Sequence, residues 1–263
     1  MSEPRNTPAV SYEVTDRVAH VTIERADKRN AMSLEVFDQL TERAAQVAAD
    51  ADVGAVVVSG RGGTFSSGID VSVFGNQLEG GVDGEFIGRL QAAFTAYEEL
   101  DVPTIAAVEG YCFGGGIQLA IACHLRMVAP SAQMSVMEAR WGLVPDLGGT
   151  HRLPRLVGLG RATELTLTAR KVDAEEAIAI GLAELTLPED GAQEAAHEYA
   201  ARLAAGPGAL RRAPRLLREN LGRDRDAALA AEAATQEACI GGPDFREAVS
   251  AHLEGRSPTF EGS

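Results

Sequence analysis

The chain has 263 residues and a formal charge of −14 at pH 7, from 24 Lys and Arg against 38 Asp and Glu. This acidity argues against nucleic acid as a partner, because affinity for nucleic acid depends on basic side chains that neutralise phosphates. The three cysteines are widely spaced, which argues against a disulfide framework or a cysteine metal site and favours a reduced, cytoplasmic protein.

No targeting or membrane segment is expected. The first residues carry charge and proline where a signal peptide would be apolar. The longest run without a formal charge, residues 110–125, is too short and too rich in glycine to span a bilayer.

The N-terminal part of the chain alternates strand and helix patterns. After an irregular tail at 1–9, residues 10–14 and 18–23 alternate apolar and polar side chains, as an edge hairpin does. The polar segment ERADKRNAMS predicts a surface loop, with Ser33 as the N-cap of a helix. The run AVVVS at 55–59 is typical of a strand buried on both faces of a parallel sheet.

Two glycine-rich turns follow predicted strands. The first, GRGGTFSSGID, is followed by an expected mobile loop at 75–84 and an amphipathic helix with apolar positions from 86 to 97. The second, VEGYCFGGGIQ, follows the strand 104–108 and opens a helix over 117–123, with a short strand at 127–129. Because ligands collect at the C-terminal ends of parallel strands, both turns are expected at one binding edge of an α/β fold.

Beyond residue 150 the pattern is helical. Asp173 and Glu176 form a capping box, Gly181 is an expected C-cap, and residues 192–205 have helical spacing. The sequence Gly206-Pro207-Gly208 then separates a last, helix-rich segment.

Glycines at a helix start leave backbone N–H groups without intrahelical acceptors, so the second turn can hold a negatively charged oxygen. Neither turn matches the phosphate-binding patterns of nucleotide-binding proteins. Two turns on neighbouring strands can each supply one N–H to a single oxygen, which is how an oxyanion hole is built. A purely structural role for each turn stays open at this point.

Serine hydrolysis and zinc chemistry are both disfavoured. Ser66 or Ser67 would need a base to act as a nucleophile. The histidines show neither a recognisable partner arrangement nor H-E-x-x-H spacing. They are His20, His124, His151, His197 and His252.

Carboxylates are better candidates. Glu138 and Asp146 bracket the segment EARWGLVPD, where Gly142 and Pro145 disfavour a continuous helix and the neighbours are apolar. An acid in an apolar pocket has a raised pKa, which suits proton transfer near neutral pH. Surface acids without a role are the alternative in so acidic a chain.

Six motifs, in order, resemble the crotonase (enoyl-CoA hydratase/isomerase) family over nearly the whole chain. They are ERADKRNAMS, TFSSGID, AAVEGYCFGGGIQLAIACHLR, VPDLGGTHRLPRLVG, KVDAEEAIAIGLA and DFREAVSAHLEGRSP. The resemblance implies an α/β fold: a crotonase-like ββα spiral over residues 1–205, with two nearly perpendicular sheets, and a C-terminal helical trimerisation region over 206–263. It also implies a homotrimer or dimer of trimers, an acyl-CoA substrate, and no metal or bound cofactor.

The resemblance also implies site residues. The N–H groups of Ser67 and Gly115 would form the oxyanion hole for the thioester carbonyl. Contacts to the substrate and its CoA part are expected from Lys28, Arg29, Ala31, Ser66, Gly68, Ile69, Asp70 and Gly114. The arginines from Arg211 to Arg218 are an alternative contact for the CoA phosphates, and a solvated helix face explains that cluster equally well.

One departure from the family pattern bears on the reaction. Family hydratases resemble one another in having glutamates at the positions of Gln118 and Glu138, and an amide cannot take a proton from water. A double-bond isomerase needs one base, so we expect isomerisation by Glu138, with Gln118 orienting and Asp146 assisting as in the similar dienoyl-CoA isomerase branch. Ala139, Arg140 and Trp141 can reshape the pocket.

Three alternatives stay open. They are a one-glutamate enoyl-CoA hydratase, a catalytically silent acyl-CoA or RNA binder, and a thioester hydrolase.

Overall fold

The computed structural model describes residues 8–75 and 83–262 and contains a six-stranded sheet in the order β1-β2-β3-β4-β6-β9. The first pair is antiparallel, as the predicted hairpin requires, and the other pairings are parallel. The strands are β1 (Val10–Thr15), β2 (Val18–Ile23), β3 (Ala55–Gly60), β4 (Thr104–Val108), β6 (Leu125–Val128) and β9 (Leu185–Thr186). Most of the expected tail at 1–9 and of the loop at 75–84 lies outside the described residues.

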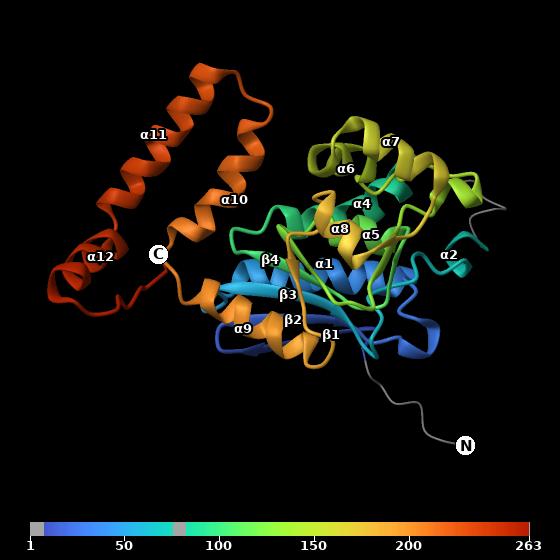
Figure 1. Cartoon of the computed structure of the whole chain (residues 1–263), viewed down its shortest axis with the longest axis horizontal. Helices are drawn as coiled ribbons and strands as arrows, with labels where there is room; N and C mark the ends of the chain where they lie inside the picture. The colour runs from blue at the N-terminus through green and yellow to red at the C-terminus, as the bar shows by residue number, and fades with distance from the viewer. Residues whose placement is uncertain (1–7, 76–82, 263) are drawn as a thin grey trace.

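Helices cover both faces of this sheet, with α1 (Leu34–Ala49) and α9 (Ala192–Ala204) on opposite sides in Figure 1. The AVVVS run explains why both faces need covering. Val56 and Val58 pack into one apolar cluster, together with residues of α1 and of α4 (Gly84–Glu98), and Ala55 and Val57 pack into another. The second cluster contains the small side chains of α9, which let that helix lie close to the strands. The predicted two-faced burial is confirmed.

A second, three-stranded sheet agrees with the two sheets that the resemblance implies, although the sequence pattern did not predict its individual strands. It consists of β5 (Tyr111–Phe113), β7 (Gln133–Ser135) and β8 (Val172–Asp173), in the order β5-β7-β8. Strand β5 lies between β4, which matches the strand predicted at 104–108, and the glycines at 114–116. The chain therefore passes from one sheet to the other before the helix begins. That helix, α5, spans Gly115–Ala120 and not 117–123, because the glycines themselves form its first turn.

The remaining short elements lie in the connections between strands. They are η1 (Ala26–Lys28), α2 (Ser72–Gly75), η2 (Glu138–Trp141), α6 (Gly149–Val157), α7 (Leu159–Thr168) and α8 (Ala174–Ala179). One half of the predicted capping box at α8 is confirmed, because the Asp173 carboxylate accepts from the Glu176 N–H at 2.9 Å, whereas the Glu176 carboxylate pairs with Arg170. Ser33 occupies the N-cap position of α1 without a side-chain hydrogen bond to it.

The C-terminal helices α10 (Ala209–Asn220), α11 (Arg225–Gly241) and α12 (Pro243–Glu254) extend away from the sheets in Figure 1. Neither α10 nor α11 contains a buried residue. This unit exposes large apolar side chains at Leu217, Leu221, Leu229, Ile240, Phe245, Val249 and Leu253. Among the described residues, no helix is long and apolar enough to cross a membrane.

Among the described residues, the most deeply buried cation is Arg126 on β6, which is 2% exposed. Its guanidinium donates to the carbonyls of Leu182 at 3.0 Å and Cys123 at 2.9 Å and pairs with the Glu184 carboxylate. Glu184 also accepts from the Arg126 main-chain N–H at 2.7 Å. The ion pair therefore fixes the return of the chain from α8 to β9.

We predict that Arg126→Met lowers the free energy of unfolding by about 3 kcal/mol. The substitution leaves the buried carbonyls of Leu182 and Cys123 without a hydrogen-bond donor and Glu184 without its ion-pair partner. Urea titration followed by circular dichroism measures the change. Arg256→Met is the matched control, since Arg256 pairs with Glu247 and Glu254 at the surface and should change stability by less than about 1 kcal/mol. Equal effects of the two substitutions would contradict this role of Arg126.

Candidate active site

The glycine corner places two backbone N–H groups around one small space. Gly115 is the first residue of α5, so its N–H has no intrahelical acceptor. The preceding Gly114 has φ +52°, in the region that favours glycine, and its N–H donates to the Ser135 carbonyl at 3.0 Å. The Gly115 N–H is therefore available to an external acceptor at the end of β5.

The second N–H belongs to Ile69. A parallel bridge joins Met32 to Ile69: the Met32 N–H donates to the Gly68 carbonyl and the Asp70 N–H to the Met32 carbonyl, both at 2.9 Å. In such a bridge the central residue's own N–H points away from its partner. A Cβ built on Gly115 would lie 3.7 Å from the Ile69 nitrogen, and one on Gly68 would lie 3.7 Å from the Gly115 nitrogen. The two donors therefore face the same space.

The prediction that Ser67 supplies the partner N–H is wrong for this structure. The Ser67 N–H donates to the Arg29 carbonyl at 2.9 Å. Each residue from Ser66 to Asp70 carries an N–H, and the register of the bridge to Met32 decides which one faces Gly115. The sequence does not contain that register, so Ile69 was expected only among the substrate contacts.

Side chains of the same loop hold its shape. The Ser66 hydroxyl is fully buried, donates to the Asn30 carbonyl at 2.8 Å and accepts from the Gly68 N–H at 3.1 Å, so it does not present a nucleophile. The Asp70 carboxylate accepts from Ser72 and pairs with Arg25 at 3.0 Å, which lowers its pKa to about 2. These contacts stiffen the loop that carries the Ile69 N–H.

Arg25 also holds the loop before α1, because its guanidinium donates to the Ala31 carbonyl. Lys28 and Arg29 are exposed at η1 and just after it. They lie next to the site loop, since the Arg29 carbonyl accepts the Ser67 N–H. Their expected contact with the CoA part of a substrate stays a prediction.

Glu138 is a buried carboxylate placed against the glycine corner. Its side chain is 7% exposed, and a Cβ on Gly114 would lie 3.5 Å from Oε1. Desolvation raises its pKa; hydrogen bonds from its own backbone N–H and from Gln118 oppose this rise, and the charge of Asp146 adds to it. Its Oε2 atom is buried and has no hydrogen-bond partner among the described residues. This oxygen is therefore free to exchange a proton with a bound molecule.

The amide of Gln118 joins Glu138 to the loop before α6. Its Nε2 donates to Glu138 Oε1 at 2.7 Å, and its Oε1 accepts from the N–H groups of Leu147 at 2.8 Å and Gly149 at 3.0 Å. A Cβ on Gly149 would lie 2.8 Å from Oε1, so this close approach needs glycine. Gln118 is 1% exposed. The amide is a buried clamp between two segments that are distant in the sequence.

Asp146 lies in the same loop, half-buried, and desolvation raises the pKa of its carboxyl. Its charge adds to the raised pKa of Glu138, and its assisting role stays a prediction. The loop is fixed from α4, because Gln91 Nε2 donates to the Asp146 carbonyl at 2.6 Å. Nothing in the sequence around Gln91 indicated this contact.

The arginines of α10 are committed elsewhere within the chain. Arg211 donates to the Val53 carbonyl at 2.8 Å, Arg218 donates to the Glu98 carbonyl, and Arg215 pairs with Glu219 at 2.7 Å. In Figure 1, α10 and α2, which follows Asp70, lie at opposite ends of the molecule. Within one chain these arginines are therefore not part of the site.

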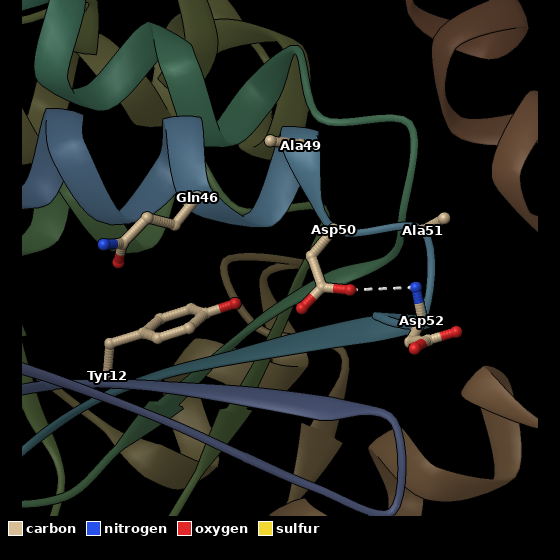
Figure 2. Close-up of a pocket in the computed structure, with 6 residues that line it drawn as sticks. All are labelled: Tyr12, Gln46, Ala49, Asp50, Ala51 and Asp52. Atoms are coloured by element: carbon tan, nitrogen blue, oxygen red, sulfur yellow. Dashed lines mark hydrogen bonds between the residues drawn. The ribbon is translucent and has the colours of Figure 1, made fainter.

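The hollow drawn in Figure 2 is also separate from the site. It has a volume of about 490 Å³ and lies between α1 and β1, where the Tyr12 hydroxyl points toward Asp50. None of the predicted site residues lines it.

Comparisons with known proteins point to one family. The profile of the Enoyl-CoA hydratase/isomerase family matches residues 13–263. The mitochondrial methylglutaconyl-CoA hydratase of Mus musculus is 33% identical over 246 residues, which cover 91% of this chain and 78% of that protein. The short-chain-enoyl-CoA hydratase of Clostridium acetobutylicum is 32% identical over 250 residues, covering 94% of this chain and 95% of that protein.

Solved structures show the same fold. The crystal structure of an enoyl-CoA hydratase from Bacillus anthracis superposes with a TM-score of 0.90 at 30% identity, covering 97% of this chain and 100% of the other. The expectation of a crotonase fold is confirmed.

We predict that Glu138→Gln raises the melting temperature at pH 7. The pKa of Glu138 is higher in the folded state than the ordinary value of 4.5. Above pH 4.5 the folded state therefore binds more protons than the unfolded state, and the free energy of unfolding decreases as pH rises from 4.5 toward the folded-state pKa. The amide of the Glu138→Gln variant does not ionise, so the variant does not lose this stability. The increase in melting temperature should become smaller as pH falls below 4.5.

Glu247→Gln is the control of opposite sign, because the pKa of Glu247 is lowered to about 2 by Arg256 and the Thr259 N–H. This substitution should destabilise the protein at pH 7. Thermal melts from pH 4 to pH 8 measure both variants. A Glu138→Gln variant less stable than the parent at pH 7 would contradict the burial of an ionised carboxylate.

Proposed function

The chain belongs to the enoyl-CoA hydratase/isomerase family and is an acyl-CoA enzyme, and from this premise we propose that it moves a double bond within an enoyl- or dienoyl-CoA. In this proposal Glu138 is the single proton-transfer base. The N–H groups of Ile69 and Gly115 stabilise the thioester enolate that forms when the base takes a proton.

The observation that carries the proposal is the hydrogen bonding of Gln118. Its oxygen already accepts two backbone N–H groups, and its nitrogen donates to Glu138. An amide has no proton-accepting nitrogen at neutral pH, so Gln118 cannot activate water as a carboxylate would. This supports a reaction that needs one base.

The proposed steps follow from the geometry. Glu138 Oε2 removes a proton from the carbon next to the thioester, and the electron pair moves onto the carbonyl oxygen. That oxygen lies between the two N–H donors, and one such donor contributes about 10² to 10³ in rate in other enzymes. Glu138 then returns the proton at the far end of the conjugated system, so that the double bond shifts and the thioester carbonyl re-forms.

Asp146 has an assisting role in this proposal. Burial raises the pKa of its carboxyl, which allows it to hold a proton, and its charge adds to the raised pKa of Glu138. In a dienoyl substrate, the carbon that loses a proton and the carbon that gains one lie farther apart. A second carboxyl group can exchange the proton at the more distant carbon.

Hydration is the second candidate, because the matched relatives named above are hydratases. In that case Glu138 alone would have to activate water, and Gln118 would at most orient it. Crotonyl-CoA distinguishes the two reactions, since a hydratase converts it into 3-hydroxybutyryl-CoA while an isomerase leaves it without added water.

The exposed apolar side chains of α10 to α12 support a proposal for assembly as a homotrimer or dimer of trimers. Leu217 on α10 and Leu221 at its C-cap are 72% and 67% exposed, and Leu253 on α12 is 80% exposed. Large apolar surfaces of this kind are typical of contacts between protein chains. Burial of these side chains against another copy would remove them from water.

We predict that Glu138→Gln lowers the turnover of 3-enoyl- or dienoyl-CoA by about 10² to 10⁴, because it removes the proton-transfer group. The parent is assayed on 2-enoyl-, 3-enoyl- and dienoyl-CoA with identification of every product. Its kcat/KM should fall at acid pH with an apparent pKa above 4.5, since burial raises the pKa of Glu138. Unchanged isomerisation by the variant would reject the assignment.

For assembly, we predict that Leu253→Glu shifts the protein toward monomers, because it places a charge on the exposed apolar surface. Sedimentation velocity measures the shift. Leu167→Glu is the control, because Leu167 is 75% exposed on α7, outside the C-terminal helices. A parent that sediments as a monomer would reject the proposal.

A further inference from the structure

A buried arginine holds the same loop as the Gln118 amide. Arg152 on α6 is 8% exposed, and its Nη1 donates to the Leu147 carbonyl at 3.0 Å. The N–H of the same Leu147 residue donates to Gln118 Oε1 at 2.8 Å. A Cβ built on Gly148 would lie 1.9 Å from Arg152 Nη1, so the guanidinium packs directly on this backbone. Both backbone polar groups of Leu147 are therefore held by buried side chains.

The guanidinium is also anchored on α4. Nε and Nη2 of Arg152 donate to Glu98 Oε2 at 3.0 Å and 2.5 Å, and Glu98 is the last residue of that helix. Gln91 on the same helix donates to the Asp146 carbonyl at 2.6 Å. Helix α4 therefore holds two consecutive carbonyls of the loop, that of Asp146 directly and that of Leu147 through Arg152.

The anchored loop determines where the Gln118 amide lies. The amide oxygen accepts two N–H groups of the loop, and the amide nitrogen donates to Glu138 Oε1 at 2.7 Å. The guanidinium of Arg152 is paired with Glu98, so its effect on Glu138 depends mainly on the position of the loop. A displacement of about 1 Å at a reacting group can cost about 10² in rate. Small movements of the loop should therefore affect catalysis.

We propose that Arg152, held by Glu98, is a positioning residue that fixes the loop around Gln118 and thereby aims Glu138 at the carbon next to the thioester. The proposal rests on Glu138 as the proton-transfer base, and it holds for isomerisation and for hydration alike. A buried ion pair adds little net stability compared with apolar side chains of similar volume, but its directional hydrogen bonds select one geometry.

The test compares Arg152→Met with Arg126→Met, which breaks another buried ion pair outside the candidate site. Both variants lose a buried cation and should be destabilised. We measure kcat and KM on the enoyl-CoA that the parent converts, at a temperature where thermal melts show both variants folded. Arg152→Met should lower kcat about 10²-fold with little change in KM, and Arg126→Met should keep the kcat of the parent.

A double-mutant cycle shows whether Arg152 acts through Gln118. Gln118→Met removes the three hydrogen bonds of the amide and keeps a similar side-chain volume. In this background Arg152→Met should lower kcat by less than about twofold, because the connection to Glu138 is already lost. A further loss as large as in the parent background would show an independent role and overturn the proposal.

Two milder substitutions apply if Arg152→Met does not fold. Glu98→Gln keeps an oxygen acceptor for the guanidinium and should retain most of kcat. Arg152→Lys keeps the charge, but its single ammonium cannot reproduce the fork that joins Glu98 to the Leu147 carbonyl. Its kcat should lie between those of Glu98→Gln and Glu138→Gln. Parent-like kcat in Arg152→Lys would reject the positioning role.

The Glu138→Gln variant separates this proposal from the proposed function. A fully active Glu138→Gln rejects the base itself. An inactive Glu138→Gln, together with an Arg152→Met variant that is as active as Arg126→Met, rejects only the positioning by Arg152.

Discussion

The clamp formed by the Gln118 amide is the interaction on which the candidate site depends. It connects the helix after the glycine corner, the carboxylate of Glu138 and the loop before α6 through three hydrogen bonds in a buried environment. An unpaired amide at such a position would be costly, so these groups are strongly held in one arrangement. The clamp leaves Oε2 of Glu138 without a hydrogen-bond partner in the part of the chain that the structure describes.

The close packing of the clamp explains why glycines surround it. Gly149 brings its N–H to the Gln118 oxygen, and Gly114 lets Glu138 approach the corner. Desolvation of the ionised form of Glu138 lowers the stability of the folded state as pH rises, and such a cost is typical of sites arranged for chemistry.

Much of this arrangement could be predicted from the sequence. The AVVVS run indicates a strand covered on both faces, and the glycines at 114–116 indicate a helix start with free N–H groups. Glu138 and Asp146 differ from the other acidic residues because they bracket a segment with apolar side chains, where a carboxyl group is expected to have a raised pKa. These features are local, and local pattern determines them.

Features that depend on register were not predictable. The choice of Ile69 over Ser67 is set by the bridge to Met32, and the small β5-β7-β8 sheet forms between strands of two or three residues that lack a clear pattern. The role of Gln118 as a clamp depends on Leu147 and Gly149, 29 and 31 positions away. Contacts over such separations come from the tertiary fold.

Transfer of deuterium within the substrate tests the one-base account most directly. A 3-enoyl-CoA labelled with deuterium at C2 is converted in ordinary water, and the products are analysed by mass spectrometry and NMR. The account predicts a 2-enoyl-CoA product that carries part of the deuterium at C4, because the buried Glu138 returns what it removed before exchange is complete. A product without deuterium at C4, or 3-hydroxyacyl-CoA as the main product, would contradict it.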